Sequence, residues 1–282
     1  MRSVRHLIAA GAASLISTVA FAADMPSIMP PPPLYSPPPP VACCEDFGGW
    51  YLRGDIGMTN QKVKTLYNVL NTSAGTGVNP IFYDFDSSMT FGGGIGYQFN
   101  NWFRADLTAE YRGKANFHGL EVVSFNGGVV GTDEYHASKS EWLVLANAYA
   151  DLGTWWCVTP FVGVGMGTSR NSISNFTDIN TPNRGVAFGV NNSQWQFAYA
   201  AYAGLSYKVN NSFTVELAYR YLNMGDGLTG DLQTYTGTNL VNNPTTFKDL
   251  TSQDVRLGVR WSLQPTPAPG PMYAPAPLIR KG

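Results

Sequence analysis

The alternation of apolar and polar residues restricts the fold of this chain more than any other feature. In residues 213–221 (FTVELAYRY) every odd position is large and apolar, whereas Glu216 and Arg220 occupy even positions. Side chains on a β-strand point alternately to opposite faces, so such a strand has one apolar and one charged face. The pattern recurs along the chain, and its apolar face is unusually rich in aromatic residues. It predicts strands that separate an apolar environment from a polar one.

Eight segments can serve as such strands, each of roughly nine to fifteen residues, which is near the length that a tilted strand needs to cross a bilayer. They span residues 49–59, 88–99, 103–112, 140–152, 158–168, 194–209, 213–223 and 252–263. The predicted fold is all-β: an eight-stranded antiparallel up-and-down transmembrane β-barrel with long extracellular loops. A β-sandwich, which also has alternating strands, is the alternative.

The connections between these segments alternate in length. Three of them are tight turns rich in Asn, Gly and Ser, as hairpins favour; they lie at residues 100–102, 153–157 and 210–212. The other four are long and rich in Asn, Gly and Thr; they lie at residues 60–87, 113–139, 169–193 and 224–251. Outer-membrane barrels have short periplasmic turns and long outer loops, so we expect four mobile polar loops at the cell surface.

The amino terminus has the features of an export signal. Arg2 and Arg5 precede an apolar stretch at residues 7–19, and residues 20–22 (AFA) form a small-residue cleavage site. We therefore expect a signal peptide at residues 1–22. A membrane anchor is the alternative, and it is disfavoured because the apolar run is too short to span a bilayer comfortably.

Proline marks the borders of the folded domain. A Pro-rich segment at residues 23–46 is expected to lie in the periplasm, and a second Pro-rich segment forms the C-terminal tail at residues 264–282. The barrel domain is expected between them, at residues 47–263.

Composition agrees with a membrane barrel. The chain is 44% hydrophobic and 13% aromatic but only 13% charged, whereas soluble domains have about 25% charged residues. After the export signal, no window approaches eighteen consecutive apolar residues, so strands would have to cross the membrane. The net charge of −1 does not favour a nucleic-acid partner.

Charged residues of both signs fall on the inward face of the predicted strands. Each would cost several kilocalories per mole if it faced lipid, so we place them in the lumen. The predicted lumen charge network consists of Arg53, Asp55, Arg104, Asp106, Glu110, Arg112, Glu216, Arg220, Arg256 and Arg260. Side chains fill the interior of an eight-stranded barrel, so we expect these charges to pair and plug it. Inward-facing glycines in residues 92–96 and 163–167 are expected to make room for the arginines.

The three cysteines suggest a crosslink. Cys157 lies in a predicted periplasmic turn, and Cys43 and Cys44 precede the first strand on the same side of the membrane. A disulfide from Cys157 to Cys43 or Cys44 suits that oxidising compartment, with a Cys43–Cys44 bond or free thiols as the alternatives. The cysteines lack metal-ligand spacing.

Three stretches resemble a known family. They are residues 47–57 (FGGWYLRGDIG), residues 148–153 (AYADLG) leading into 159–165 (TPFVGVG), and the last predicted strand. They are similar to the alphaproteobacterial small outer-membrane β-barrel proteins, a porin-like group of which some members are described as haem-binding. The resemblance covers residues 47–263 and implies an OmpA-like eight-stranded barrel in the cell outer membrane.

The last predicted strand also resembles the signal that the barrel-assembly machinery reads. Residues 256–263 (RLGVRWSL) contain a polar residue, then Gly258, then apolar and aromatic residues at alternate positions, with Trp261 and Leu263 at the end. Such signals usually close the chain on an aromatic residue. Here the chain continues for nineteen residues past Leu263, so the tail is free to lie aside or to contact the cell wall.

Few residues suggest chemistry. His118 and His136 share a long loop and are weak candidates for binding haem iron or a metal. Lipid hydrolysis by His136 and Ser138 would need a carboxylate to orient the imidazole. Glu141 would point to the opposite face of the strand from Ser138, so we expect no enzymatic activity.

The sequence therefore predicts a monomeric barrel with a structural and surface-interaction role. Its expected partners are outer-membrane lipids, lipopolysaccharide and the barrel-assembly machinery. A small-solute porin and a haem-binding receptor are the alternatives. We expect no bound cofactor, apart from the weak case for haem.

Overall fold

The computed structural model describes residues 48–237 and 241–263 of the 282-residue chain. By its internal contacts the chain divides into Met1–Pro40 and Val41–Gly282, and every described residue belongs to the second unit. The predicted signal peptide, Pro-rich segment and C-terminal tail lie outside the described residues. In the described part of the chain, no helix has the length and apolar character needed to span a membrane.

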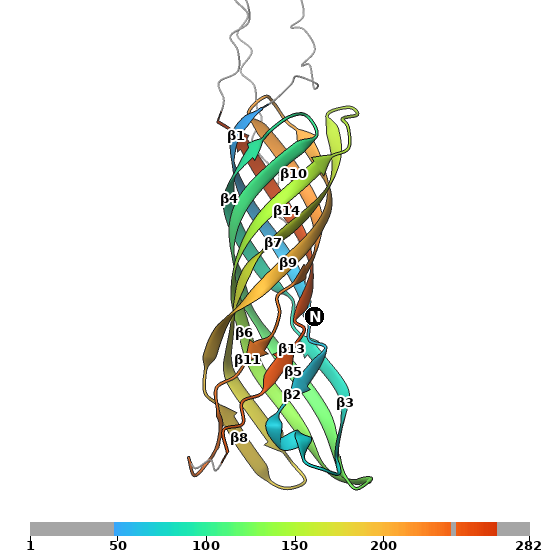
Figure 1. The fold of residues 1–282 in the computed structure, drawn as a ribbon, viewed down its shortest axis with the longest axis vertical. Coiled ribbons are helices and arrows are strands. Elements are labelled where there is room, and N and C mark those ends of the chain that lie inside the picture. Colours follow the sequence, from blue (N-terminus) through green and yellow to red (C-terminus); the bar gives the residue numbers. More distant parts are fainter. Residues whose placement is uncertain (1–47, 238–240, 264–282) are drawn as a thin grey trace, which may run out of the picture. The chain divides into compact units, whose positions relative to one another are not determined.

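Eight long strands of the described chain close into an antiparallel barrel (Figure 1). They are β1 (Gly49–Lys62), β4 (Ser88–Gln98), β5 (Phe103–Phe125), β6 (Gly128–Asp151), β7 (Val158–Asn180), β9 (Asn192–Lys208), β10 (Phe213–Asn223) and β14 (Thr251–Ser262). Each pairs with its neighbours along the ring, and β1 pairs with both β4 and β14, which joins the first strand to the last. The predicted eight-stranded up-and-down barrel is confirmed.

Every barrel strand places large apolar side chains on the outer surface. One exposed example per strand, in chain order, is Ile56, Phe91, Leu107, Trp142, Val164, Phe197, Leu217 and Leu257. Aromatic rings collect at both ends of this surface. At the short-turn end Phe213 stacks on Trp261 with centroids 6.0 Å apart, and at the other end Tyr111 lies 5.1 Å from Trp142. Such girdles mark the two interfaces of a bilayer with the barrel.

Short turns join the strands at one end of the barrel, which is drawn at the top of Figure 1. Two of them use the same device. The carboxamide oxygen of Asn100 accepts a hydrogen bond from the backbone N–H of Phe103 at 2.8 Å, and Asn210 accepts one from Phe213 at 2.8 Å. An Asn that bonds its own backbone in this way holds a tight turn, so the predicted hairpins have a local cause.

Three strands run well past the length that a bilayer needs. β5, β6 and β7 have 23, 24 and 23 residues, whereas the sequence predicts that they end at Arg112, begin at Ser140 and end at Thr168. That prediction is wrong at the outer ends. The register shifts between Arg112 and Ala115 on β5 and again beside Asn175 on β7. A bulge reverses which residues face inward, so a fixed two-residue period ends there although the strand continues.

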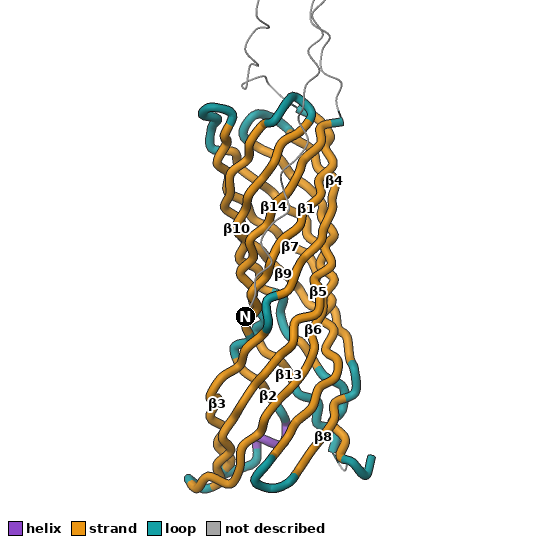
Figure 2. Tube along the Cα trace, turned by 180° about the vertical axis from the view of Figure 1, so that it is seen from behind, coloured by secondary structure: helices purple, strands orange, loops and turns teal. Residues whose placement is uncertain are grey.

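We call the outer part of the described chain the extension; it comprises residues 64–87, 113–139, 171–192, 224–237 and 241–250 (Figure 2). It contains β2 (Thr65–Tyr67), η1 (Val69–Thr72), β3 (Thr76–Phe85), β8 (Gly185–Gly189), β11 (Gly227–Leu228), β12 (Leu232–Thr234) and β13 (Thr246–Lys248). β3 pairs with β5, β8 with β7, and β12 with β8, while β11, β13 and β2 form a second sheet. The predicted polar loops are therefore largely strands.

An aromatic core holds the extension together. Phe247 of β13 lies 5.0 Å from Phe117 of β5, 6.1 Å from Phe176 of β7 and 6.4 Å from Phe85 of β3, measured between ring centroids. All four side chains are buried. The small sheet thus packs against the continued barrel strands as two sheets pack in a soluble domain.

Candidate functional site

The lumen of the barrel is filled by charged side chains of both signs. Among the described residues, seven cations and seven anions form one set of ion pairs. The cations are Arg53, Arg104, Arg112, Lys139, Arg220, Arg256 and Arg260, and the anions are Asp55, Asp106, Glu110, Glu141, Asp151, Glu216 and Asp254. None of these side chains is more than 11% exposed. The set is electrically neutral, which suits a dry interior.

The outer half of the lumen is built around two arginines and a shared carboxylate. Arg112 lies 2.8 Å from Glu141 and 2.9 Å from Asp254. Arg220 lies 2.6 Å from the same Asp254 and 2.6 Å from Glu110. Because each guanidinium reaches at least two carboxylates, the four strands that carry these residues are held to one another across the lumen.

The inner half of the lumen is centred on Glu216 and Arg53. Glu216 lies 3.0 Å from Arg104 and 2.8 Å from Arg260. Arg53 lies 2.7 Å from Asp106 and 3.4 Å from Glu216. All five residues are among the charges that the sequence assigns to the lumen, and Glu216 and Arg260 lie on the paired strands β10 and β14.

Arg256 joins the two halves, because it lies 3.2 Å from Asp55 and 3.4 Å from Glu110. Neutral polar groups fill the space between the charges. Asn147, for example, donates a hydrogen bond to Asp106 at 2.8 Å and accepts one from Tyr202 at 2.8 Å. A connected polar network therefore runs through the lumen, and inward apolar side chains such as Leu143, Leu145 and Phe161 share the interior with it.

Four members of the network are missing from the predicted set: Lys139, Glu141, Asp151 and Asp254. Asp254 pairs with Arg112 and Arg220, and its even number on the last strand, like that of Arg256, was a signal that could have found it. Lys139 pairs with Glu141 and donates to Gln61 at 2.8 Å. Lys139 lies one residue before the predicted start of its strand, so it was assigned to a loop and not to the lumen.

The inward-facing glycines serve partners other than the predicted ones. A Cβ atom on Gly96 would lie 2.2 Å from the ring of Tyr51, and one on Gly163 would lie 2.4 Å from the ring of Tyr149. A Cβ on Gly165 would lie 2.2 Å from the Oδ1 atom of Asn147. These glycines make room for tyrosine and asparagine side chains and not directly for arginines.

Apolar side chains cover the outer end of the charge network. Beyond Arg220 the next inward positions of β10 and its continuation are Leu222 and Met224, and Ile173 and Leu250 belong to the same buried cluster. Each of these four side chains is almost fully buried. Water from the outer end would have to pass this apolar layer before it reached the ion pairs.

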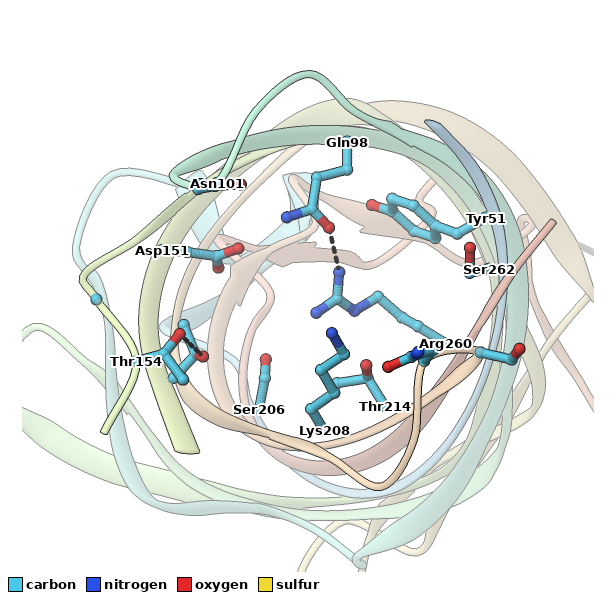
Figure 3. A pocket seen from close by; sticks show the side chains of 14 residues that line it. Tyr51, Gln98, Asn101, Asp151, Thr154, Ser206, Lys208, Thr214, Arg260 and Ser262 are labelled. Atoms are coloured by element: carbon cyan, nitrogen blue, oxygen red, sulfur yellow. Dashed lines mark hydrogen bonds between the residues drawn. The ribbon is translucent and has the colours of Figure 1, made fainter. Parts of the chain in front are cut away.

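A polar cavity of about 290 Å³ opens at the opposite end, beside the short turns. Figure 3 looks into it, and Lys208 and Arg260 both point toward its centre. Arg260 donates to Gln98 at 3.3 Å and lies against Glu216. Tyr51 and Ser206 also line the cavity, so the inner half of the charge network borders it.

Comparison with known proteins identifies the family. A family model described as "Outer membrane protein beta-barrel domain" matches residues 36–262. The chain belongs to this outer-membrane β-barrel family. An uncharacterized protein of Brucella suis is 33% identical over 207 residues, which are 64% of this chain and 69% of that protein. The outer membrane protein PagN of Salmonella typhimurium is 30% identical over 146 residues, or 48% of this chain and 58% of PagN.

Among solved structures, Neisserial surface protein A aligns with a TM-score of 0.43 and 15% identity over 78% of this chain and 99% of that chain. The family match and the Brucella relative confirm the predicted resemblance, and with it the place of this barrel in the cell outer membrane. In such barrels short turns face the periplasm, so the extension faces outward.

The two histidines of the described chain lie on the outer face of the extension of this outer-membrane barrel. His118 on β5 is the register partner of His136 on β6, and their Nδ1 atoms are 3.0 Å apart. Two axial ligands on opposite sides of one haem iron need nitrogen atoms about 4 Å apart, twice a metal–nitrogen bond of about 2.0 Å. The observed pair is closer than that and lies on one surface.

The residues considered for lipid hydrolysis lie on opposite sides of β6. His136 is part of the outer face, and Ser138 donates to Asn116. Glu141 is buried in the lumen against Arg112. The carboxylate therefore cannot orient this imidazole, and the three residues do not form a catalytic set.

Three carboxyl groups meet inside the extension. Tyr135 donates to Glu121 at 3.0 Å, and Asp133 and Asp178 lie close by on β6 and β7. Burial, followed by the charges of Asp133 and Glu121, raises the pKa of Asp178 to about 7. Burial also raises the pKa values of Glu121 and Asp133. This cluster holds protons more tightly than ordinary carboxyl groups do.

Cys157 lies in the turn before β7 and is disulfide-bonded. The other two cysteines of the chain, Cys43 and Cys44, lie outside the described residues. The choice of partner stays a prediction.

The residues of the predicted assembly signal lie on the last strand and just past it. Trp261 and Leu263 are exposed on the outer surface. Gly258 stands beside Asp55, where a Cβ atom would lie 2.5 Å from the carboxylate. Reading of this strand by the assembly machinery stays a prediction.

Proposed function

We propose that this outer-membrane barrel is a closed structural anchor that presents the extension at the cell surface. One observation supports this above all: fourteen charges of balanced sign fill the lumen with almost no exposure. Separating such buried pairs is costly, because each isolated charge would lose its partner in a medium of low dielectric. The apolar layer at Leu222 and Met224 closes the outer end as well. A small-solute porin would need both barriers to rearrange.

Planar-bilayer recordings on the refolded barrel test this proposal. We expect silence under conditions in which a porin conducts steadily. The double variant Arg104→Ala/Glu216→Ala removes a matched pair and two long side chains, and we expect it to show openings. Leu217→Ala, on the lipid-facing side of β10, is the matched control and should stay silent. Steady, large openings of the unmodified barrel would overturn the closed-lumen proposal and favour the porin.

The outer surfaces suggest what this anchor contacts. We propose that its apolar belt contacts outer-membrane lipid and lipopolysaccharide, and that it is a monomer, because the pairing of β1 with β14 leaves the ring of described strands without an open edge. We also propose that the C-terminal tail contacts the cell wall and that the assembly machinery recognises the last strand. We assign no catalytic role to the chain.

A further inference from the structure

Two of the chain's three histidines form a cross-strand pair on the extension. His118 and His136 are direct register partners, and their rings stand nearly perpendicular, at 85°, with centroids 5.0 Å apart. The outer aromatic girdle at Tyr111 lies seven residues before His118, or about 20 Å along an extended strand. The pair therefore meets the external medium and not lipid.

The spacing of the two Nδ1 atoms suits a single metal ion. They are 3.0 Å apart. Two imidazole nitrogens bound side by side to one ion, each at about 2.0–2.1 Å, lie about 2.9–3.4 Å apart for bond angles between octahedral and tetrahedral. Both rings are fixed to paired strands of one sheet, so little rearrangement is needed to bring an ion between them.

A carboxylate sets the proton on one of these rings. The Nε2 atom of His136 lies 2.9 Å from Oε1 of Glu134, so Nε2–H donates to the carboxylate and the Nδ1 lone pair accepts from Nδ1–H of His118, a proton that a bound ion would replace. Metal-binding histidines commonly donate their second ring N–H to a carboxylate in this way, which fixes the tautomer and makes the imidazole a better ligand. Glu134 thus prepares His136 on the side that faces His118.

The surroundings leave room for further ligands. The side chains of His136 and Glu134 are 39% and 50% exposed, so water can complete the coordination. Asp84 on β3 is the register partner of His118 on its other side. Directly opposed residues share a face of the sheet, so this carboxylate lies on the same face as the pair. Among the described residues no third His, Cys, Asp or Glu side chain completes a metal-binding group.

We infer that His118 and His136 form a surface site for a divalent transition metal ion of the Zn²⁺ and Cu²⁺ class, with Glu134 as a positioning residue. Imidazole nitrogen suits these ions, and Mg²⁺ and Ca²⁺, which prefer oxygen ligands, should bind poorly. A bound ion would tie β5 to β6 at the middle of the extension. It would stabilise that region by mass action.

Calorimetric titration of the refolded, untagged mature barrel with ZnCl₂ and with CuCl₂ tests this inference. We expect one ion per chain and no heat from MgCl₂. Either His118→Ala or His136→Ala should abolish binding, and Glu134→Gln should weaken it about tenfold. Ser138→Ala, on the same face of β6, is the matched control and should bind like the parent. Copper binding should also show nitrogen couplings from two imidazoles in the electron paramagnetic resonance spectrum.

Two results would overturn the inference. One is the absence of Zn²⁺ and Cu²⁺ binding by a barrel that is folded by circular dichroism. The other is binding that persists unchanged in the His118→Ala/His136→Ala double variant, because the ion would then sit elsewhere.

Discussion

Glu216 is contacted by three guanidinium groups, at 3.4 Å from Arg53, 3.0 Å from Arg104 and 2.8 Å from Arg260. No lipid or water is needed to satisfy it. Glu216 stabilises the barrel by neutralising these three arginines, because removing one member of a buried set of charges leaves the others without a partner.

We expect Glu216→Ala to lower the free energy of unfolding by about 3–5 kcal/mol, the usual cost of leaving a buried partner charge unpaired. Urea unfolding in lipid vesicles, followed by tryptophan fluorescence, measures the change. The control Glu134→Gln alters an exposed carboxylate and should change stability by less than about 0.5 kcal/mol. Equal effects of the two substitutions would contradict the role given to the lumen pairs.

Among the elements, the extension behaves as a small domain built on continued barrel strands. Phe247 of β13 contacts phenylalanine rings of β3, β5 and β7. Nothing in that contact depends on the membrane, so the extension and the membrane-spanning part should respond separately to core substitutions.

Phe247→Ala tests this separation. Loss of a buried phenylalanine costs about 3–5 kcal/mol, and we expect this loss to fall on the extension alone. Limited proteolysis should then cut between β11 and β13, while the membrane-spanning part keeps its resistance to protease. Phe197→Ala, on the lipid-facing side of β9, is the control and should leave the extension protected. Unfolding of the whole barrel by Phe247→Ala would contradict the prediction.

The carboxyl cluster gives the extension a pH dependence. The pKa of Asp178 is raised from its ordinary value of 3.8 to about 7 by burial and by Asp133 and Glu121. Between pH 4 and 7 the folded extension retains a proton that the unfolded chain has released, so stability falls as pH rises through this window and then levels off. Tyr83, Tyr135 and Asn180 are the other polar groups bonded to these carboxyls, and they bring no compensating cation.

Hydrogen exchange measured at several pH values, with correction for the intrinsic rates, checks this dependence. The amides of β6 and β7 in the extension should be better protected at pH 5 than at pH 8. Asp178→Asn should remove most of the difference and stabilise the extension by about 1–2 kcal/mol at pH 8. A pH profile that Asp178→Asn leaves unchanged would place the titration elsewhere.

The elements differ in how far the sequence predicts them. Strands in the membrane follow from the two-residue period, because lipid on one side and a narrow polar lumen on the other impose it on every position. The strands of the extension cannot be predicted from this period, for two reasons. Bulges between Arg112 and Ala115 and beside Asn175 break the period, and contacts such as Phe117 with Phe247 join residues far apart in the chain.

The site shows the same division. Membership of the lumen network follows from parity, which places Arg53, Glu216 and Arg260 inside. The pairing partners do not follow from it, because they depend on the height of each side chain across the closed ring. The sequence also does not predict that His118 and His136 lie close together. Their contact depends on the pairing of β5 with β6 beyond the bulge, where the two-residue period is broken.

At the scale of the whole molecule, two unlike interiors share one set of strands. The membrane-spanning part has an apolar outside and a charged inside, whereas the extension has an aromatic inside. The change occurs at the bulges, where the faces of β5 and β7 exchange. One continuous strand can therefore serve both a lipid-facing wall and a water-facing domain.

The seam between β1 and β14 bears on how the barrel is assembled. Five of the fourteen lumen charges belong to these two strands: Arg53 and Asp55 on β1, and Asp254, Arg256 and Arg260 on β14. An intermediate that has inserted all strands but has not joined the first to the last carries these charges without their full complement. Such an intermediate is high in free energy because its buried charges lack partners, so we expect closure to be cooperative, with the last strand to pair completing both the wall and its electrostatic balance.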